Sequence, residues 1–226
     1  RDVPTTVLTR SKRSAELVND ARAMPVASLA GIALPASVRA STDAADALAG
    51  ATLIIHAVPV QSSRGFLKKV CRHVPAGCPV LCTSKGIEVK TLKLMAEILP
   101  ETLGRERAYA FLSGPSFAKE IALGMATAVV VASEDARLAR DISRLVSSDT
   151  FRVFTSRDVV GLEVGGAVKN VIALAAGMCE GLDLGTNAMA ALVTRGCYEM
   201  RRIGLSMGGK SETFMGLSGV GDTFGT

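Results

Sequence analysis

The chain has 226 residues, of which 48 % are hydrophobic and 21 % are charged, and its formal net charge is +5. This composition excludes intrinsically disordered and fibrous proteins and provides enough apolar material for a real hydrophobic core. The mild positive charge suits an anionic small molecule as well as a nucleic acid. However, only 4 % of the residues are aromatic and none is Trp. Because few side chains could stack on bases, we expect no nucleic-acid partner.

Short apolar runs alternate with helical patterns over most of the chain. Strands are predicted over residues 5–9, 53–58, 79–83, 109–112, 126–132 and 151–154. Helices are predicted over residues 11–23, 62–74, 91–99, 117–123 and 136–146. The strands are continuously apolar rather than alternating, which is typical of a parallel sheet covered by helices on both faces. The predicted fold class is therefore α/β, with a doubly wound sheet.

The pattern changes near Asp158. Beyond it, residues 159–181 and 187–204 are predicted to form two long helices without a strand between them. We therefore expect two domains, an α/β domain over residues 1–157 and the beginning of an all-helical domain over residues 158–226.

The longest run without a Lys, Arg, Asp or Glu covers residues 47–63. It contains Gly50 and Pro59 and is too short and too broken to span a membrane. We therefore expect no membrane span.

Histidine and cysteine are too sparse for a metal centre. The chain has two histidines, His56 and His73, and five cysteines at irregular spacing without a C-x-x-C pair. We expect no metal site, and scattered cysteines in odd number are typical of reduced thiols. His56 lies in an apolar run and is predicted to be a core or strand-end residue rather than a ligand.

Both ends of the chain look cut from something longer. The chain begins at Arg1 without Met and stops at Thr226, directly after a glycine-rich run. The dinucleotide fingerprint G-x-G-x-x-G is absent. If residues 5–9 are the second strand of a dinucleotide-binding fold, we expect this fingerprint upstream of Arg1.

Residues that follow the predicted strands are the first functional candidates, because ligands of doubly wound sheets bind at the carboxyl ends of the strands. Pro59 follows one apolar run and Lys85 follows the next. A lysine there could contact a phosphate or carboxylate, although turn lysines are usually only solvated. Gly114 and Ser116 flank Pro115 at the predicted start of a helix. Free N–H groups at such a start could bind an anion, or this could be an ordinary helix start.

Lys169 is the most informative residue. Its neighbours at helical spacing are small or apolar, so we expect burial to favour its neutral amine, which is what a general base for alcohol oxidation needs. A lysine that extends out of a packed helix is the alternative. Gly165 and Gly166 also allow a ligand or another backbone to approach closely. Asp222, the one charge in residues 216–226, could cap a turn, accept a hydroxyl group or pair with Lys169.

Arg10 ends the first predicted strand and begins a basic cluster with Lys12 and Arg13. In a doubly wound nucleotide-binding sheet, an arginine at this place can accommodate the 2′-phosphate of NADP, and a solvated helix start is the alternative. The residues leave both NAD and NADP open as cofactors. Arg195 is predicted to be a plain surface arginine.

Five sequence blocks follow one another in order: Val58-Pro59, Thr83-Ser84-Lys85-Gly86, residues 113–120, residues 165–173 and Gly219-Val220-Gly221-Asp222. Together with Asn187-Ala188 and Thr194-Arg195-Gly196, they closely resemble the bacterial type of the NAD(P)-dependent sn-glycerol-3-phosphate dehydrogenases. The likeness covers essentially the whole chain and keeps the approximate spacing of the family. One block alone is a weak signal, whereas five in register are a strong one.

The resemblance implies an enzyme that interconverts sn-glycerol 3-phosphate and dihydroxyacetone phosphate with NAD or NADP. It also implies a Rossmann-like domain, a helical domain and a homodimer. Cytoplasm is the default compartment, with a plastid or peroxisome-like organelle left open. By its motif, Lys169 is implied to be the proton acceptor. Substrate contacts are implied for Lys85, Gly114, Ser116, Lys169, Asp222, Asn170 and Thr226. Cofactor contacts are implied for Arg10, Pro59, Lys85 and Ala118.

The chain departs from the family pattern in a few places. It lacks the glycine-rich first turn and the Arg-Asn pair expected soon after Asp222, and Ser116 stands where many relatives have Thr. Two other functions stay open on the residues alone. One is a β-hydroxyacid dehydrogenase of similar two-domain plan, and the other is a non-catalytic nucleotide-binding module that reuses the fold.

Overall fold

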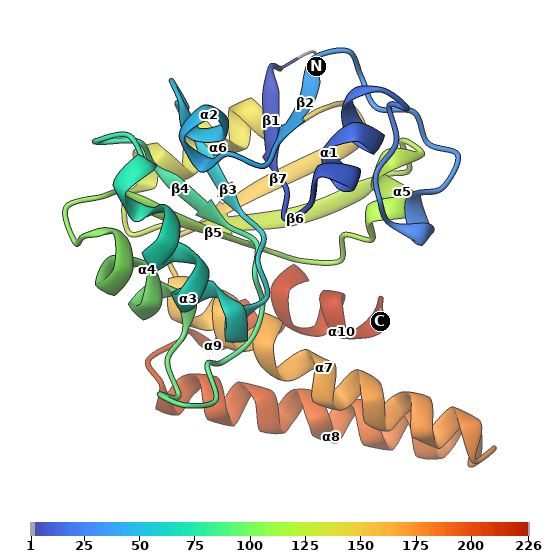
Figure 1. Ribbon diagram of the computed structural model, residues 1–226. Helices are drawn as coiled ribbons and strands as arrows, with labels where there is room; N and C mark the ends of the chain where they lie inside the picture. Colours follow the sequence, from blue (N-terminus) through green and yellow to red (C-terminus); the bar gives the residue numbers. More distant parts are fainter. Residues whose placement is uncertain (1–2, 226) are drawn as a thin grey trace.

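The computed structural model describes residues 3–225, and Figure 1 labels its elements. The strands are β1 (Thr5–Leu8), β2 (Val38–Ser41), β3 (Ile54–His56), β4 (Val80–Cys82), β5 (Tyr109–Ser113), β6 (Thr127–Ala132) and β7 (Phe151–Ser156). The helices among them are α1 (Lys12–Asn19), α2 (Ala44–Leu48), α3 (Val60–Val70), α4 (Met95–Leu103), α5 (Ala118–Ala122) and α6 (Ala136–Val146), with short 3₁₀ turns η1 (Ala27–Leu29) and η2 (Cys71–His73).

The chain then continues without further strands in its described part. It forms α7 (Val159–Gly181), α8 (Gly185–Ser206), α9 (Ser211–Phe214), the π-helical turn η3 (Leu217–Gly221) and α10 (Asp222–Phe224). This order confirms the predicted fold class, a Rossmann-like α/β sheet followed by a helical region.

The strands form two sheets. β1 pairs with β2 in parallel, and the larger sheet has the order β3-β4-β5-β6-β7. The pairs β3–β4, β4–β5 and β6–β7 are parallel, whereas β5–β6 is antiparallel. The prediction of a purely parallel sheet is therefore wrong at one pair.

The antiparallel pair is explained by the short helix α5 in the connection between β5 and β6. A parallel return needs a crossover of a dozen or more residues, usually a helix that runs back along the sheet. α5 has five residues and is about 7.5 Å long, too short to run back beside strands that rise roughly 3.3 Å per residue. β6 therefore begins at the edge where β5 ends. The carboxyl ends of β3, β4 and β5 meet at that same edge.

Both faces of the larger sheet are buried. On one face, Val80 and Phe111 pack with side chains from α3, α4 and the start of α7. On the other face, Leu81 and Val129 pack with Ala139 and other side chains of α6. Successive side chains of a strand point to opposite faces, so Val80 and Leu81 enter different cores. This double burial explains the continuously apolar strands.

β2 and α2 lie where the sequence pattern predicts no element. β2 has the sequence VRAS, and Ala40 is its one fully buried residue. α2 has five residues and begins at Asp43, whose side chain accepts the N–H of Ala45. Elements this short and this polar carry too few apolar positions for a periodic pattern, and pairing with β1 is what defines β2.

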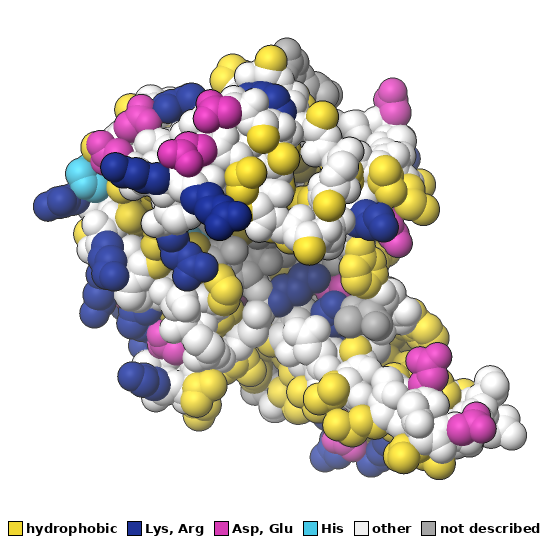
Figure 2. All heavy atoms as spheres, turned by 45° about the vertical axis from the view of Figure 1, so that its right-hand side comes forward, with side chains coloured by type: hydrophobic (Ala, Val, Ile, Leu, Met, Phe, Trp, Pro, Cys, Tyr) yellow, Lys and Arg dark blue, Asp and Glu magenta, His cyan; other side chains and the backbone are white. Residues whose placement is uncertain are grey.

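α7 and α8 form a helical pair that extends away from the sheet (Figure 1). Asp158 caps α7, because its carboxylate accepts the N–H of Gly161 at 2.9 Å. Phe214 of α9 is 1 % exposed and packs in the core between these helices. A Cβ atom on Gly204 would lie only 1.8 Å from this ring, so the missing side chain makes room for it. Figure 2 shows hydrophobic side chains exposed along the outer part of the pair.

By length and composition, α7 could cross a membrane, with a mean hydropathy of 1.6 over its most apolar window. Half of that window is buried inside the protein, and Glu163 and Lys169 of this helix have polar partners there. A helix that is apolar on most sides is either a membrane span or a core helix, and this burial is typical of the second.

Replacing Phe214 by Ala should lower the free energy of unfolding by about 3–5 kcal/mol, because the ring leaves a cavity that its glycine neighbours cannot fill. Phe224 is a matched control, since it is 74 % exposed. Phe224→Ala should change the free energy of unfolding by less than about 0.5 kcal/mol. Chemical denaturation of both variants measures the difference, and equal losses would contradict this description of the helical core.

Candidate active site

Two lysines and one aspartate meet at the edge of the sheet where β4 and β5 end. Lys169 Nζ lies 2.9 Å from one carboxylate oxygen of Asp222, and Lys85 Nζ donates a hydrogen bond to the other. Lys169 comes from α7, Lys85 from the turn after β4, and Asp222 from the start of α10. Of the alternatives for Asp222, pairing with Lys169 is therefore the arrangement in the structure.

All three groups of this lysine–aspartate cluster are largely shielded from water. Lys169 is 7 % exposed and Asp222 is 2 % exposed, while the side chain of Lys85 is 23 % exposed. One carboxylate between two ammonium groups offsets their repulsion and part of the cost of removing them from water. Burial lowers the pKa of Lys85, an effect that Asp222 opposes and Lys169 reinforces. The alternatives of a solvated turn lysine for Lys85 and of a lysine that extends out of its helix for Lys169 are therefore wrong.

Gly114 and Ser116 lie beside Lys85 but do not begin a helix. Lys85 Nζ donates to the carbonyl oxygen of Gly114 at 3.2 Å, and Ser116 Oγ donates to the same oxygen at 3.1 Å. Gly114 has a φ angle of +138°, and a Cβ atom there would lie 3.0 Å from Val129 Cα. This non-helical backbone keeps Gly114 out of the helix, so the expected opening of the helix at residues 114–116 is wrong, whereas the predicted range 117–123 agrees with α5 within one residue at each end.

Gly165 and Gly166 let α7 approach the rest of the cluster. A Cβ atom on Gly165 would lie 2.7 Å from the carbonyl oxygen of Ser218, so the segment that leads to Asp222 lies directly on α7. A Cβ atom on Gly166 would lie 2.9 Å from Ser113 Oγ and 3.4 Å from Lys85 Cγ. The expectation that another backbone approaches these glycines is confirmed at Gly165.

Neither Ser113 nor Ser218 is among the predicted site residues. Both are buried, and each is a contact of one glycine of the Gly165-Gly166 pair. Two consecutive glycines within a helix are therefore the signal that could have indicated such neighbours, although not their identity. Which residue approaches such a glycine depends on the tertiary fold and cannot be read from the neighbouring sequence.

The remaining predicted site residues lie at the surface. Arg10 is exposed between β1 and α1, and Pro59 is exposed at the start of α3. Ala118 is exposed at the start of α5, and Asn170 is exposed beside Lys169 on α7. Thr226 lies outside the described residues.

Besides Asp222, the carboxyl group of Glu163 on α7 is also buried, and it is not among the predicted site residues. Its Oε2 atom accepts the N–H of Ala96 at 3.0 Å, in the first turn of α4. Burial raises the pKa of Glu163 to about 8. It also lines a small cavity of about 10 Å³ together with Lys85 and Gly166. Glu163 thus joins the helix of Lys169 to the α/β part of the chain.

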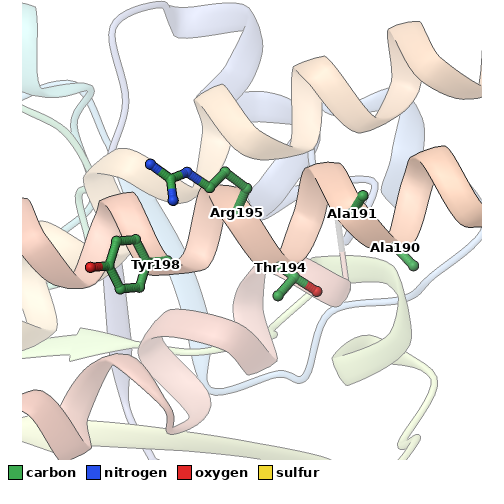
Figure 3. Close-up of a pocket in the computed structure, with 5 residues that line it drawn as sticks. All are labelled: Ala190, Ala191, Thr194, Arg195 and Tyr198. Atoms are coloured by element: carbon green, nitrogen blue, oxygen red, sulfur yellow. The ribbon is translucent and has the colours of Figure 1, made fainter.

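A larger hollow lies elsewhere, along α8. Figure 3 shows its lining residues, all of which belong to that helix: Ala190, Ala191, Thr194, Arg195 and Tyr198. The guanidinium of Arg195 stacks on the ring of Tyr198 at 5.1 Å and pairs with Glu199 at 2.8 Å. Its side chain is 68 % exposed, as predicted for a surface arginine. This open groove has one charged lining residue, so the buried lysine–aspartate cluster is the better candidate for chemistry.

Replacing Gly166 by Ala should destabilise the protein by about 1–3 kcal/mol, because the new methyl group would collide with Ser113 Oγ and press on Lys85. Gly177 of the same helix is a matched control with open space at its Cβ position. Gly177→Ala should raise stability by up to about 1 kcal/mol through helix propensity alone. Thermal unfolding of both variants measures the shift, and the same sign for both would contradict the close approach at Gly166.

Replacing Glu163 by Gln should change how stability depends on pH. The folded protein holds the Glu163 proton up to a pKa of about 8, whereas the ordinary value is 4.5. Stability should therefore fall as the pH rises from 4.5 to about 8, at up to about 1.4 kcal/mol per pH unit. Gln cannot ionise and can still accept the N–H of Ala96, so Glu163→Gln should gain stability relative to wild type over this range.

Melting temperatures between pH 5 and pH 9 measure this effect. Glu180→Gln, at an exposed position of the same helix, is the control and should follow the wild-type curve. A constant difference between Glu163→Gln and wild type at every pH would show that the carboxyl group does not hold its proton as described.

The chain matches two family models. Residues 2–139 match the N-terminus of NAD-dependent glycerol-3-phosphate dehydrogenase, and residues 158–226 match its C-terminus. The chloroplastic, NAD(+)-type glycerol-3-phosphate dehydrogenase of Oryza sativa is 50 % identical over 190 residues, which cover 84 % of this chain and 43 % of that protein. The NAD(P)+-type enzyme of Geobacter sulfurreducens is 46 % identical over 212 residues, which cover 92 % of this chain and 63 % of that protein. The chain thus spans less than two thirds of either relative.

Solved structures show the same similarity. The crystal structure of glycerol-3-phosphate dehydrogenase from Coxiella burnetii matches with a TM-score of 0.91 at 32 % identity, over 97 % of this chain and 66 % of that chain. The yeast glycerol-3-phosphate dehydrogenase structure matches with a TM-score of 0.81 at 28 % identity, over the same shares of the two chains. From the two family models, which together cover both parts of the fold, the chain belongs to the NAD-dependent glycerol-3-phosphate dehydrogenase family.

Proposed function

We propose that the protein carrying this chain interconverts sn-glycerol 3-phosphate and dihydroxyacetone phosphate, with NAD or NADP as the cofactor. The observation that carries this proposal is the buried cluster in which Asp222 holds Lys85 and Lys169 at the carboxyl edge of the sheet. Family membership supports it, since the relatives are named for this activity. The proposal concerns the whole protein, because the chain spans only part of those relatives.

Lys169 is the proposed proton acceptor. When bound, the nicotinamide cofactor takes up the hydride that leaves C2 of glycerol 3-phosphate. The neutral amine of Lys169 accepts the proton of the C2 hydroxyl group. In the reverse direction, its ammonium form donates that proton to the carbonyl oxygen and stabilises the developing alkoxide. Asp222 orients the amine and stabilises its ammonium form through the 2.9 Å contact.

Lys85 is the proposed electrostatic partner. With Lys169 in its ammonium form, the two ammonium groups and one carboxylate leave a net positive charge at the cluster, which attracts dihydroxyacetone phosphate. Asp222, which binds both amines, is proposed as a further substrate contact on the basis of its family motif. Gly114, Ser116, Asn170 and Thr226 are proposed as further substrate contacts on the basis of the family motifs.

Arg10, Pro59 and Ala118 are the proposed cofactor contacts, together with Lys85. Arg10 is exposed directly before Ser11, the residue that caps α1. An exposed cation at the end of β1 fits an anionic dinucleotide and suits the 2′-phosphate of NADP, while NAD stays an alternative. Pro59 is exposed at the end of β3, where a bound dinucleotide can lie over the backbone.

We also propose an assembly and a compartment for the protein. A homodimer is supported by exposed apolar residues on α7 and α8, among them Leu174, Tyr198 and Ile203. Cytoplasm is the proposed compartment, and the chloroplastic names of two relatives support a plastid as the alternative. The match to the C-terminal family model, which begins at residue 158, supports the proposed domain boundary between residues 157 and 158.

Steady-state reduction of dihydroxyacetone phosphate by the full-length protein, with NADH and NADPH in turn, tests the proposal. Lys169→Ala should lower kcat by about 10²–10⁴-fold, because no group remains to donate the proton. Lys169→Arg should be similarly slow, since a guanidinium keeps the charge beside Asp222 but does not exchange its proton. Binding of the reduced cofactor, measured by its fluorescence, should stay nearly unchanged in both variants.

Lys68→Ala is the control, because Lys68 is an exposed lysine near the end of α3. It should retain the wild-type kcat. Wild-type turnover in Lys169→Arg would remove Lys169 from proton transfer. Oxidation of a β-hydroxyacid, without activity on glycerol 3-phosphate, would contradict the proposed substrate.

A further inference from the structure

His56 is a buried titratable group that the proposed mechanism does not use. It ends β3, is 3 % exposed, and its ring lies 6.2 Å from the ring of Phe66 on α3. Its Nε2 atom is 2.8 Å from the hydroxyl oxygen of Ser63, which is also buried. Burial lowers the pKa of His56 to about 4, so its imidazole is neutral at neutral pH. The strand-end position agrees with the prediction from the sequence.

The direction of the hydrogen bonds follows from Ser63. Its Oγ atom lies 3.0 Å from the carbonyl oxygen of Val58 and 3.2 Å from that of Pro59. A carbonyl oxygen can only accept, so Ser63 donates its single proton there. The contact with His56 then requires Nε2 to carry a hydrogen and to donate it to Ser63 Oγ. The neutral imidazole in this tautomer therefore supports the turn that follows β3.

A second serine holds the same turn from the neighbouring strand. Ser84 Oγ donates to the carbonyl oxygen of Val58 at 2.6 Å. This oxygen thus accepts from both Ser63 and Ser84, which links the end of β3 to the end of β4. The residue after Ser84 is Lys85, whose amine binds Asp222. Polar contacts therefore connect His56 to Ser84, and the peptide bond between Ser84 and Lys85 joins them to the lysine–aspartate cluster.

We propose that His56 is a positioning residue which, through Ser63, sets the turn that contains Pro59 relative to Lys85. This inference rests on the proposed function, in which Pro59 contacts the cofactor and Lys85 contacts both cofactor and substrate. Without the imidazole donor, the Ser63 hydroxyl can still donate to the carbonyl oxygens of Val58 and Pro59, but it loses the hydrogen bond that orients it, so the turn is held less firmly. The cofactor then binds more weakly and is placed less accurately against Lys85.

Two substitutions of His56 in the full-length protein separate hydrogen bonding from packing. Leu fills the apolar space but has no donor, whereas the side-chain amide of Gln can donate from near the position of Nε2. We expect His56→Leu to raise the KM for the reduced cofactor about tenfold and to lower kcat. A tenfold change in affinity corresponds to the free energy of about one buried hydrogen bond. His56→Gln should recover most of this loss. The KM for dihydroxyacetone phosphate should change by less than about threefold.

Ser63→Ala interrupts the same chain of contacts and keeps the proposal testable if His56→Leu does not fold. Its matched control is Ser143→Ala, because Ser143 on α6 also donates to a strand carbonyl, that of Val153, at 3.0 Å on the opposite face of the sheet. Both variants lose a serine hydroxyl that donates to a backbone carbonyl, and Ser63→Ala also removes the acceptor of the His56 hydrogen bond. We expect the cofactor KM to rise only in Ser63→Ala. The Kd of the reduced cofactor, read from nicotinamide fluorescence, provides the same comparison without turnover.

Equal cofactor affinities in His56→Leu and His56→Gln would overturn the inference, as would a Ser63→Ala variant that behaves like Ser143→Ala. A wild-type protein that binds the cofactor but does not reduce dihydroxyacetone phosphate would contradict the proposed function instead. In that case the Kd comparison still decides whether His56 positions the cofactor turn.

Discussion

One carboxylate holds two ammonium groups inside this protein, and the arrangement of the site depends on it. Two buried cations repel each other strongly where little water screens them, so Lys85 and Lys169 can lie together only with negative charge between them. Asp222 supplies that charge with both of its oxygens. While both amines are protonated, the cluster keeps a net positive charge for an anionic substrate, which a single ion pair would not provide.

This contact constrains the backbone of three separate segments. α7 must lie close to the turn after β4 and to the segment before α10, which requires glycine at positions 165 and 166. Asp158 caps α7 and also accepts the N–H of Lys210 at 2.8 Å, so the start of α7 and the beginning of α9 are held by one side chain. Glu163 binds α7 to α4. These polar contacts are buried, and they fix the orientation of α7 relative to α4 and α9. Apolar packing alone would tolerate small shifts of these helices.

Strand direction decides which groups can reach the site. Because α5 is too short for a crossover, β6 runs antiparallel to β5 and begins at the edge where β3, β4 and β5 end. The turns that contain Pro59, Lys85 and Gly114 therefore share one edge, and Ser84 connects the first of them to the second through the carbonyl oxygen of Val58. The proposed cofactor contacts and the proposed proton acceptor are thus supported by neighbouring parts of one polar framework.

The sequence by itself determined the α/β class, most strands and helices, and the residues of the cluster. Strands buried on both faces must be continuously apolar, and the motifs around Lys85, Lys169 and Asp222 are local in the chain. The tertiary structure alone decided the antiparallel pair, the two small elements after η1, and the partners of Asp222 and His56. Asp222 lies 53 and 137 positions from its two lysines, and contacts at such separations leave no periodic pattern in the sequence. They arise only when the packed sheet and α7 bring the segments together.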